Sequence, residues 1–337
     1  MGSIKVNAIM KEKILITGAG GFIGGHLTKK LLDEGYQLRA VDIKPFEQWF
    51  QKFDQCENFQ KDMTLKKSCE QMVEGMDLVL NMACNMGGMG FIENNKAECM
   101  ISVLINTHML IACKKFNIKK YFFSSSACAY NTELQKNSEI RGLKESDAYP
   151  AMPEDGYGWE KLFSERMCAH FSQDFNIDTK VARYHNIYGP YGTYDGGREK
   201  APAALCRKVI NAIENREEKI DIWGDGEQTR SFLYIDDCVD ATLKFFFSNH
   251  QGPINIGSEE KVSINQMLEK IETISKNKFK RNYQLDMPKG VRGRNSDNTL
   301  VKSLLSWEPK YDLLSGLEKT YNWIKEDIKK KHNQKNK

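Results

Sequence analysis

The 337-residue sequence predicts an α/β fold in which a doubly wound parallel sheet is joined by a smaller C-terminal α/β domain. Two observations support this prediction. Short β-branched runs alternate with longer helical patterns through the first half, which implies parallel strands with helices on both faces. Apolar residues make up 40% of the chain and charged residues 28%, which is typical of a globular protein with a large core.

The elements of the first half follow one another in a regular order. The predicted strands cover residues 13–17, 37–42, 78–83, 119–125 and 179–183, and the predicted helices cover 22–34, 98–115 and 158–175. A connection between parallel strands needs a dozen or more residues, so helices of this length fit between them.

The second half is less regular. Glycine-rich segments interrupt predicted helices at 202–213 and 236–247, and residues 253–256 are predicted to form a strand that returns to the first sheet. Arg and Lys in these loops are typical of binding at a cleft between domains. The expected division is a first domain at 11–185 with a returning segment at about 228–258, a substrate-binding domain at 186–227 and 259–326, and a Lys-rich tail at 327–337.

The charge balance argues against some classes of protein. The formal net charge is +4, but the last nine residues hold five Lys and no acidic residue, so the rest of the chain sums to −1. Nucleic-acid-binding domains usually carry a basic face, so no nucleic-acid partner is expected. The tail is predicted to be a frayed, solvated end. No apolar run approaches the roughly 20 residues of a membrane span, and residues 1–13 lack the apolar region of a secretory signal.

The cysteines indicate a reducing compartment. Nine is an odd count, and no two form a C-x-x-C pair. A disulfide framework or a structural zinc site is therefore not expected. The six histidines show no metal-ligand spacing, so no metal is predicted. A cytoplasmic location follows from this interpretation.

A glycine-rich turn predicts a dinucleotide site. KILITGAGGFIGGHL places Gly18, Gly21 and Gly24 directly after a strand and at the start of a helix. Such a turn needs glycine for positive φ and close backbone approach, and the helix N-terminus offers free N–H groups to a pyrophosphate. Asp42 ends the second strand, 18 residues after Gly24, where its carboxylate can accept from ribose hydroxyls and would repel a 2′-phosphate. The sequence therefore predicts a Rossmann-type domain that prefers NAD to NADP.

Three polar residues form a predicted catalytic group. Tyr157 and Lys161 are four residues apart at the start of a helix, so they share one face, and Ser126 ends a strand that reaches the same crevice. A Tyr hydroxyl, with a pKa near ~10, is a poor base at neutral pH. A neighbouring ammonium and a positive nicotinamide ring would lower this pKa enough for proton abstraction from a sugar hydroxyl.

Together these motifs resemble the extended, sugar-nucleotide-modifying short-chain dehydrogenase/reductases. Within that superfamily the sequence closely resembles the GDP-mannose 3,5-epimerase family from about Lys13 to Glu326. The segments that carry the likeness are NMACNMGGMGFIENN (81–95), SSSACAY (124–130), RYHNIYGPYGT (183–193), GGREKAPAALCRK (196–208), WGDGEQTRSF (223–232) and GVRGRNSDN (290–298).

The resemblance implies a mechanism and a set of site residues. Tyr157, with Lys161 and Ser126, would oxidise the sugar C4 hydroxyl, passing hydride to NAD. Cys128 and Lys200 would exchange protons at C3 and C5 before C4 is reduced again, giving GDP-L-galactose, GDP-L-gulose or both. The implied cofactor-binding residues are Gly18, Gly21, Phe22, Ile23, Gly24, Asp42, Asp62, Ala83, Tyr157 and Lys161. The implied substrate-binding residues are Gly87, Ser126, Cys128, Asn186, Glu199, Lys200, Ala201, Lys208, Gln228, Arg230 and Arg294.

The chemistry of these residues is coherent without the family name. A C4 ketone acidifies the C–H bonds at C3 and C5, and inverting such a centre requires a base on one face of the ring and an acid on the other. Cys128 is two residues beyond Ser126, so strand alternation would point both to the same side. Nearby positive charge can activate its thiol, and Lys200 lies in a loop able to reach over from the other domain.

Other activities use the same oxidation step. A 4,6-dehydratase of this superfamily has an Asp-Glu pair directly after the catalytic Ser or Thr, where this chain has Ala127 and Cys128. A simple 4-epimerase would need neither Cys128 nor Lys200, and a non-catalytic NAD-sensing protein would be expected to lose the Tyr/Lys pair. An epimerase of a GDP-heptose also remains open, because AYNTELQKN and DGYGWEK (with Gly156 and Trp159) depart from the family pattern and are expected to flank the sugar.

Two further expectations rest on analogy. Arg230 and Arg294 are implied to bind the pyrophosphate, with surface ion pairs as the alternative for Arg292 and Arg294. Extended members of the superfamily commonly pair through two helices per subunit, so a homodimer is expected through the stretches at 98–115 and 158–175.

Overall fold

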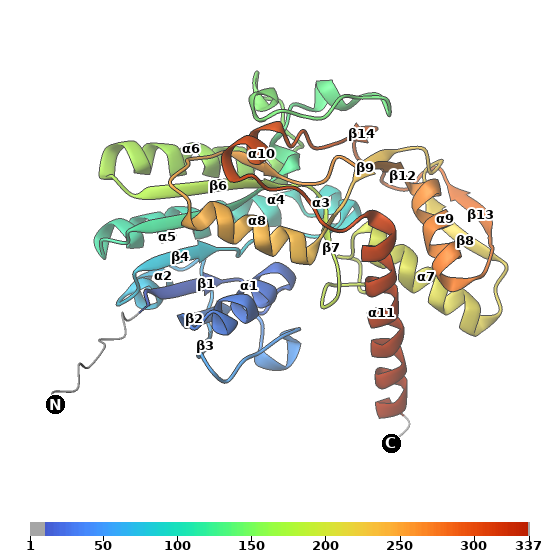
Figure 1. The fold of residues 1–337 in the computed structure, drawn as a ribbon, viewed down its shortest axis with the longest axis horizontal. Helices are drawn as coiled ribbons and strands as arrows, with labels where there is room; N and C mark the ends of the chain where they lie inside the picture. The colour runs from blue at the N-terminus through green and yellow to red at the C-terminus, as the bar shows by residue number, and fades with distance from the viewer. Residues whose placement is uncertain (1–10, 336–337) are drawn as a thin grey trace, which may run out of the picture.

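The computed structural model describes residues 11–335, and its centre is a seven-stranded parallel sheet (Figure 1). The strand order is β11-β6-β5-β4-β1-β2-β3, and every neighbouring pair is parallel. The strands are β1 (Lys13–Thr17), β2 (Gln37–Asp42), β3 (Glu57–Gln60), β4 (Leu78–Asn81), β5 (Lys120–Ser126), β6 (Asp178–Tyr184) and β11 (Ile254–Ile256). The order reverses at β1, which places a crevice at the carboxyl ends of β1 and β4.

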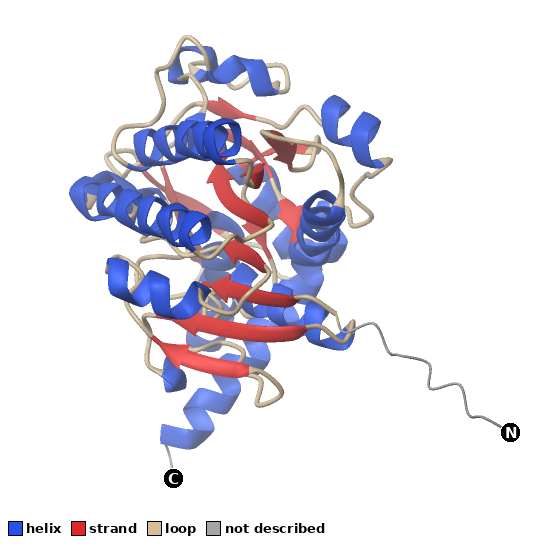
Figure 2. Ribbon diagram, turned by 90° about the vertical axis from the view of Figure 1, so that its left-hand side faces the viewer, coloured by secondary structure: helices blue, strands red, loops and turns tan. Residues whose placement is uncertain are grey.

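Helices cover both faces of this sheet, as Figure 2 shows from the side. Two of them, α1 (Phe22–Asp33) and α8 (Ile235–Phe247), bury Leu27 and Phe246 against one face. The opposite face is covered by α2 (Lys66–Val73), α5 (Val103–Lys115) and α6 (Tyr157–Phe175). The predicted doubly wound α/β fold is therefore confirmed.

A smaller set of elements forms the right-hand side of Figure 1. Its helices are α7 (Ala201–Asn215), α9 (Ile264–Ser275) and α11 (Leu313–Lys335), whereas α10 (Thr299–Leu305) lies at the top of the view near α6 and contacts β11. Its strands are β8 (Lys219–Trp223) with β13 (Lys280–Gln284), β12 (Lys261–Ser263) with β9 (Thr229–Ser231) and β14 (Gly293–Arg294), and β7 (Ile187–Tyr188) with β10 (Leu233–Tyr234). The segment expected to return at about 228–258 is shared: β9 pairs with β12 and β14, whereas β11 joins the main sheet beside β6.

The structure differs from the sequence prediction in the segment that joins β4 to β5. The predicted helix at 98–115 is two helices, α4 (Lys96–Ile101) and α5, separated at Ser102. The Ser102 hydroxyl accepts the Asn85 N–H at 2.9 Å, which ties this break to the loop after β4. A further short helix, α3 (Met89–Asn94), lies in that loop.

The expectation that the Lys-rich tail is a frayed end is wrong for its described residues, because α11 continues to Lys335. Ile328 is buried, and Tyr194 donates its hydroxyl to Asp327 at 2.6 Å. The Lys331 ammonium also bonds the Tyr194 hydroxyl at 2.8 Å. Lys329, Lys330 and Lys331 are nevertheless exposed. Residues 336 and 337 lie outside the described part of the chain, as do residues 1–10.

Candidate active site

The glycine-rich turn joins β1 to α1. Gly18 has a φ of +68°, and a Cβ there would lie 2.9 Å from the Met82 carbonyl carbon. A Cβ on Gly24 would lie 2.2 Å from the Gly18 carbonyl oxygen, so only glycine allows the helix to approach this closely. Gly21 donates its N–H to the Gly18 carbonyl at 3.0 Å and forms the N-cap of α1. Because Gly21 has no side chain, it leaves the first N–H groups of the helix uncapped.

The surroundings of this turn fit a dinucleotide. Phe22 and Ile23 open α1, so their N–H groups and the positive end of the helix dipole can bind a pyrophosphate. Asp42 ends β2 and is 7% exposed, and its Oδ1 accepts the Lys44 N–H at 3.0 Å. A carboxylate at this strand end is the usual acceptor for ribose hydroxyls. The backbone cradle and this acid together match the predicted NAD site.

Two other predicted cofactor residues line neighbouring strand ends. Ala83 follows β4, and its N–H donates to Thr17 Oγ1 at 3.2 Å. Asp62 follows β3, and its Oδ1 accepts both the N–H and the hydroxyl of Thr64. The structure therefore places Ala83 beside the end of β1 and Asp62 at the entry to α2, and their contacts to cofactor stay predictions.

The three predicted catalytic residues meet at the carboxyl end of β5. Ser126 ends β5, Tyr157 begins α6 and Lys161 follows one helical turn later. Tyr157 is 4% exposed and Lys161 1%. Burial raises the pKa of Tyr157 well above its usual value, and a hydrogen bond with Ser126 opposes this shift. A Cβ on Gly158 would lie 2.3 Å from the Cys128 carbonyl oxygen, so α6 packs tightly on the chain that follows Ser126.

The Lys161 ammonium is buried without a hydrogen-bond acceptor among the described residues. Its Nζ lies 3.3 Å from Glu160 Oε2 and 4.7 Å from the centroid of the Phe123 ring. Burial disfavours the charge, but Cys84 and Glu160 outweigh it and raise the Lys161 pKa. A buried ammonium with open donor positions suits the hydroxyls of a bound ribose.

Cys128 lies in a 3-10 turn after β5, so the strand alternation expected from Ser126 is wrong. The turn nevertheless keeps the two residues together, because the Cys128 N–H donates to Ser126 Oγ at 3.2 Å. Cys128 also packs with Tyr157 in one buried cluster. The predicted acid/base thiol therefore lies beside the predicted catalytic Tyr.

Arg294 contacts the Cys128 sulfur directly. Its Nη1 donates to Cys128 Sγ at 3.4 Å, its Nη2 to Glu154 Oε1 at 2.6 Å and its Nε to Gln135 Oε1 at 2.6 Å. Burial raises the pKa of Cys128 to about 11; the negative charge of Glu154 adds to this shift and the Arg294 guanidinium opposes it. The structure places Arg294 at the thiol, and its contact with a pyrophosphate stays a prediction.

Lys200 is the N-cap of α7 and comes from the other domain. Burial lowers its pKa, while the neighbouring Cys128 opposes this shift. Its loop is packed onto the loop after β4: Gly88 donates its N–H to the Arg198 carbonyl at 3.0 Å, and a Cβ on Gly88 would lie 2.3 Å from the Glu199 carbonyl oxygen. The sequence prediction that this loop reaches over the first domain agrees with these contacts.

The remaining predicted substrate residues lie around this loop and β9. Ala201 begins α7, Glu199 accepts from Gly197 and Arg207, and Gly87 lies against Phe91. Lys208 donates to the Asp221 carbonyl at 2.7 Å, Gln228 to the Trp223 carbonyl at 3.0 Å and Asn186 to the Ser231 carbonyl at 3.0 Å. These positions are compatible with one ligand site between the domains.

Arg230 is buried beside Arg294, and its pKa is lowered although it stays positive at neutral pH. Burial and the Arg294 charge lower its pKa to about 10. Its guanidinium donates to the carbonyls of Thr229, Lys289 and Val291. Two buried arginines facing the single carboxylate of Glu154 leave net positive charge, which favours an anionic ligand. Arg292, in contrast, forms a partly exposed ion pair with Asp225 at 2.7 Å.

Sequence reasoning missed two residues of this site and misplaced one. Glu154 and Gln135 bond Arg294 from segments far from it along the chain, and nothing in their local patterns distinguishes them from loop residues. Trp159, expected to flank the sugar, is 41% exposed on the outer face of α6, where it lines a hollow with Phe163. Gln135 belongs to the other departing segment, and it does reach the site.

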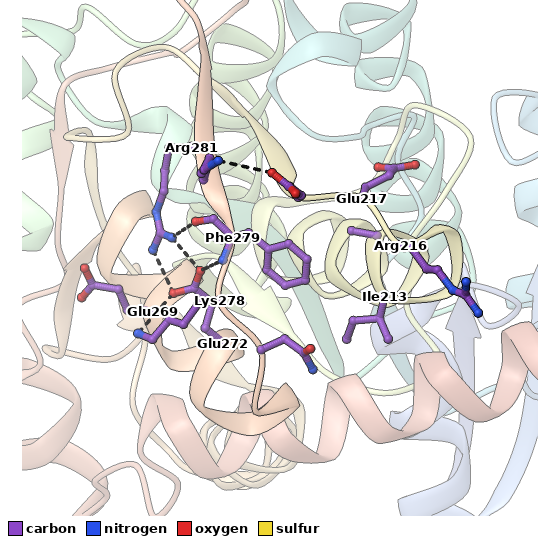
Figure 3. A pocket seen from close by; sticks show the side chains of 12 residues that line it. Ile213, Arg216, Glu217, Glu269, Glu272, Lys278, Phe279 and Arg281 are labelled. Atoms are coloured by element: carbon purple, nitrogen blue, oxygen red, sulfur yellow. Dashed lines mark hydrogen bonds and ion pairs between the residues drawn. The ribbon is translucent and has the colours of Figure 1, made fainter.

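A second hollow, of about 660 Å³, lies in the smaller domain between α7, α9 and β13 (Figure 3). Its central buried acid, Glu272, is bonded by the Phe279 N–H and by both terminal nitrogens of Arg281. Every buried charge there has its partner, so this hollow is explained by packing. Among residues 11–335, no group of three or more His, Cys, Asp or Glu is placed to bind a metal.

The comparisons with known proteins agree with this geometry. Residues 14–257 match the model of the NAD dependent epimerase/dehydratase family, so the chain belongs to that family. The GDP-mannose 3,5-epimerase of Arabidopsis thaliana is 45% identical over 320 residues, covering 94% of this chain and 83% of the relative. A GDP-mannose 3,5-epimerase 1 of Oryza sativa subsp. japonica is 45% identical over 325 residues, with 96% and 84% covered. Within the family, the chain therefore belongs with the GDP-mannose 3,5-epimerases.

Solved structures share the fold. UDP-glucose 4-epimerase of Thermotoga maritima, solved with UDP-glucose, superposes with a TM-score of 0.83 at 24% identity, covering 94% of this chain and 99% of that one. UDP-glucuronic acid 4-epimerase of Bacillus cereus, solved with UDP-glucuronic acid and NAD, gives 0.80 at 26% identity, with 93% and 99% covered. The likeness extends over both domains.

Proposed function

We propose that this protein is an NAD-dependent isomerase that epimerises GDP-mannose at C3 and C5 through a transient C4 ketone. The observation that carries the proposal is the position of Cys128 beside Ser126 and Tyr157, with Lys200 of the other domain near enough for the charge of Cys128 to affect the Lys200 pKa. A C4 oxidation alone needs only the Ser/Tyr/Lys group. Two additional ionisable residues from opposite domains suit proton exchange on the two faces of a sugar ring.

The chain's own residues provide the cofactor site. The turn from Gly18 to Gly24 and the start of α1 would bind the pyrophosphate of NAD, Asp42 the adenosine ribose and Lys161 the nicotinamide ribose. NAD, when bound, accepts hydride from C4 and returns it, so the cycle causes no net redox change. Ser126 would bind the reacting C4 oxygen, and Tyr157 would accept and return the hydroxyl proton.

The proton-exchange step follows from the opposite pKa shifts of Cys128 and Lys200. Burial raises the pKa of Cys128 and lowers that of Lys200, so burial favours the protonated thiol and shifts the amine toward its neutral form. One group can therefore donate a proton at a ring carbon while the other accepts one. After one inversion both groups have changed protonation state, so they must exchange protons with solvent or act in reverse at the second carbon.

A panel of sugar nucleotides tests the assignment. Purified protein with NAD is incubated with GDP-mannose, a GDP-heptose, UDP-glucose and UDP-glucuronic acid, and the products are identified by NMR. We expect GDP-L-galactose, GDP-L-gulose or both from GDP-mannose. Turnover of the UDP-sugars alone would identify a 4-epimerase, and turnover of the GDP-heptose alone would move the substrate assignment to that sugar.

We further propose that the protein is a homodimer through α4, α5 and α6. These helices lie together (Figure 1), and their outer faces expose Met100, Ile101, Leu104 and Phe163, the last at 51%. Helix-on-helix burial of such side chains is typical of a stable subunit interface. Phe163→Asp is expected to give a monomer by light scattering; an unchanged mass would place the interface elsewhere.

The same helices account for an apolar stretch. The residues Lys96–Lys115 are long and apolar enough to cross a membrane, but the core helices of other proteins share this length and composition. Met109 and Leu110 are buried against the sheet, and the exposed remainder belongs to the proposed interface. We therefore propose no membrane partner. The near-neutral body argues against a nucleic-acid partner, and nine unpaired cysteines support a cytoplasmic protein.

A further inference from the structure

Glu154 is a buried carboxylate that the proposed mechanism does not use. It is 8% exposed, its Oε1 accepts the Arg294 Nη2 at 2.6 Å, and its Oε2 has no hydrogen-bond donor among the described residues. It precedes Tyr157 by three residues, and the Glu154 N–H donates to the Cys128 carbonyl at 3.1 Å. Its backbone and side chain are thus both connected to the thiol's surroundings.

We propose that Glu154 is a positioning residue whose carboxylate orients the Arg294 guanidinium against the Cys128 sulfur and offsets its charge there. The proposal rests on the assignment of Cys128 as an acid/base group. Arg294 has three polar contacts, to Cys128, Glu154 and Gln135, and they fix the plane of its guanidinium. Gln135 is neutral, so Glu154 supplies the only negative charge among these three contacts.

The charges that face Cys128 come from several elements. Arg294 and Arg230 are positive, Glu154 is negative, and Lys200 and Tyr157 are ionisable neighbours. Without Glu154, two guanidinium groups would act on the sulfur with no opposing carboxylate. The thiolate would then be less disfavoured, so a larger fraction of Cys128 would be ionised at any given pH.

The variant Glu154→Gln removes the negative charge of this side chain and keeps its size and shape. An amide oxygen can still accept from Arg294, so the guanidinium stays near the sulfur while the negative charge is lost. The holoenzyme is treated with iodoacetamide between pH 6.5 and 9.5, and alkylation of the Cys128 peptide is quantified by mass spectrometry. Because only the thiolate reacts, the rate at each pH reports the thiolate fraction.

The expected result is a Cys128 profile shifted to lower pH by about one unit, which is roughly a tenfold higher rate at a fixed pH below the midpoint. Arg294→Gln, as a second variant, should shift the profile the opposite way. Glu272→Gln is the matched control, because it removes another buried carboxylate paired with an arginine, in the smaller domain, and it should leave the profile unchanged.

A purely structural role for Glu154 would lower thermal stability without moving the alkylation profile. If Glu154→Gln and the wild-type protein have coincident profiles, the proposal is wrong. If Glu154→Gln does not fold, an Arg294→Gln profile equal to wild type would overturn it equally. The assay needs no sugar nucleotide, so a failure of the epimerase assignment would appear separately, as absent product in the substrate panel.

Discussion

Two buried carboxylate–arginine pairs in this molecule differ in how completely they are satisfied. In the smaller domain, Glu272 accepts from the Phe279 N–H and from Arg281 Nη1 through Oε1, and from Arg281 Nη2 through Oε2 (Figure 3). In the cleft, Glu154 bonds Arg294 through one oxygen only. Arg294 uses its remaining donors on Gln135 and on a thiol.

The number of hydrogen bonds on each carboxylate distinguishes a charge that stabilises the fold from one that takes part in function. In a fully bonded buried pair, the hydrogen bonds offset the cost of desolvation and fix the local geometry. A buried oxygen without a hydrogen bond lowers stability, so its presence suggests a role in binding or catalysis. The cleft also contains the unpartnered Lys161 ammonium and a half-bonded Gln228 amide. Some unsatisfied polar atoms thus lie where substrate and cofactor are expected, whereas others, such as Asp240 Oδ2 and Trp307 Nε1, lie elsewhere. The hollow in the smaller domain has none among its described carboxylates.

Replacement of a buried cysteine in each region should give the largest difference in activity between the two regions. Cys128→Ala is expected to lower proton exchange on GDP-mannose by at least ~10²-fold, since general acid–base groups contribute about 10²–10⁴-fold. Cys206→Ala is the control: this thiol is buried in α7, and burial alone raises its pKa. It should retain exchange and lose only thermal stability. Equal losses of exchange in both variants would remove the distinction between the two regions.

Removing the satisfied pair should affect folding and not chemistry. Glu272→Gln leaves Arg281 without its charged partner, and we expect a loss of about 2–3 kcal/mol in the free energy of unfolding. Denaturant melts measure this loss, and turnover of GDP-mannose per folded molecule should stay at the wild-type value. A large loss of turnover with unchanged stability would assign this hollow a role in the reaction.

His185 gives a smaller, pH-dependent effect. It is fully buried, its Nε2 bonds Asn255 Oδ1 at 2.8 Å, and burial lowers its pKa to about 3. Because the unfolded state takes up a proton near pH 6.5 and the folded state does not, the stabilisation is complete above pH 6.5 and is lost as the pH falls toward 3.

Between pH 7.5 and 5.5 this one group should cost about 1.4 kcal/mol. Denaturant melts of wild type and His185→Gln at both pH values measure it, because the carboxylate contributions are common to both proteins. A pH dependence that is equal in the two would show that folding does not lower the pKa of His185.

The sequence predicts the parts of the fold that depend on local pattern. β1, β2 and the start of α1 were expected at the residues where they occur, because a buried apolar strand followed by glycines is a local signal. β3 reads ENFQ and is partly exposed at the sheet edge, so no apolar pattern marks it. The helices α9 and α11 are amphipathic and were not identified within the loop-rich second half.

The site was predictable where the chemistry is carried by motifs. Ser126, Tyr157 and Lys161 do meet, and Cys128 lies beside them, although through a 3-10 turn instead of strand alternation. Glu154 could not be found in this way. Its importance depends on Arg294, which lies 140 residues further along the chain and reaches it only through tertiary packing.

Exchange of hydrogen for deuterium at individual sugar carbons tests the central claim most directly. Holoenzyme is incubated with GDP-mannose in D₂O, and deuterium at each ring carbon is read by NMR. The account predicts deuterium at C3 and C5, none at C4, and no exchange with Cys128→Ala while NAD stays bound. Product formed without deuterium at either C3 or C5 would contradict it, because no proton would then have passed through Cys128 or Lys200.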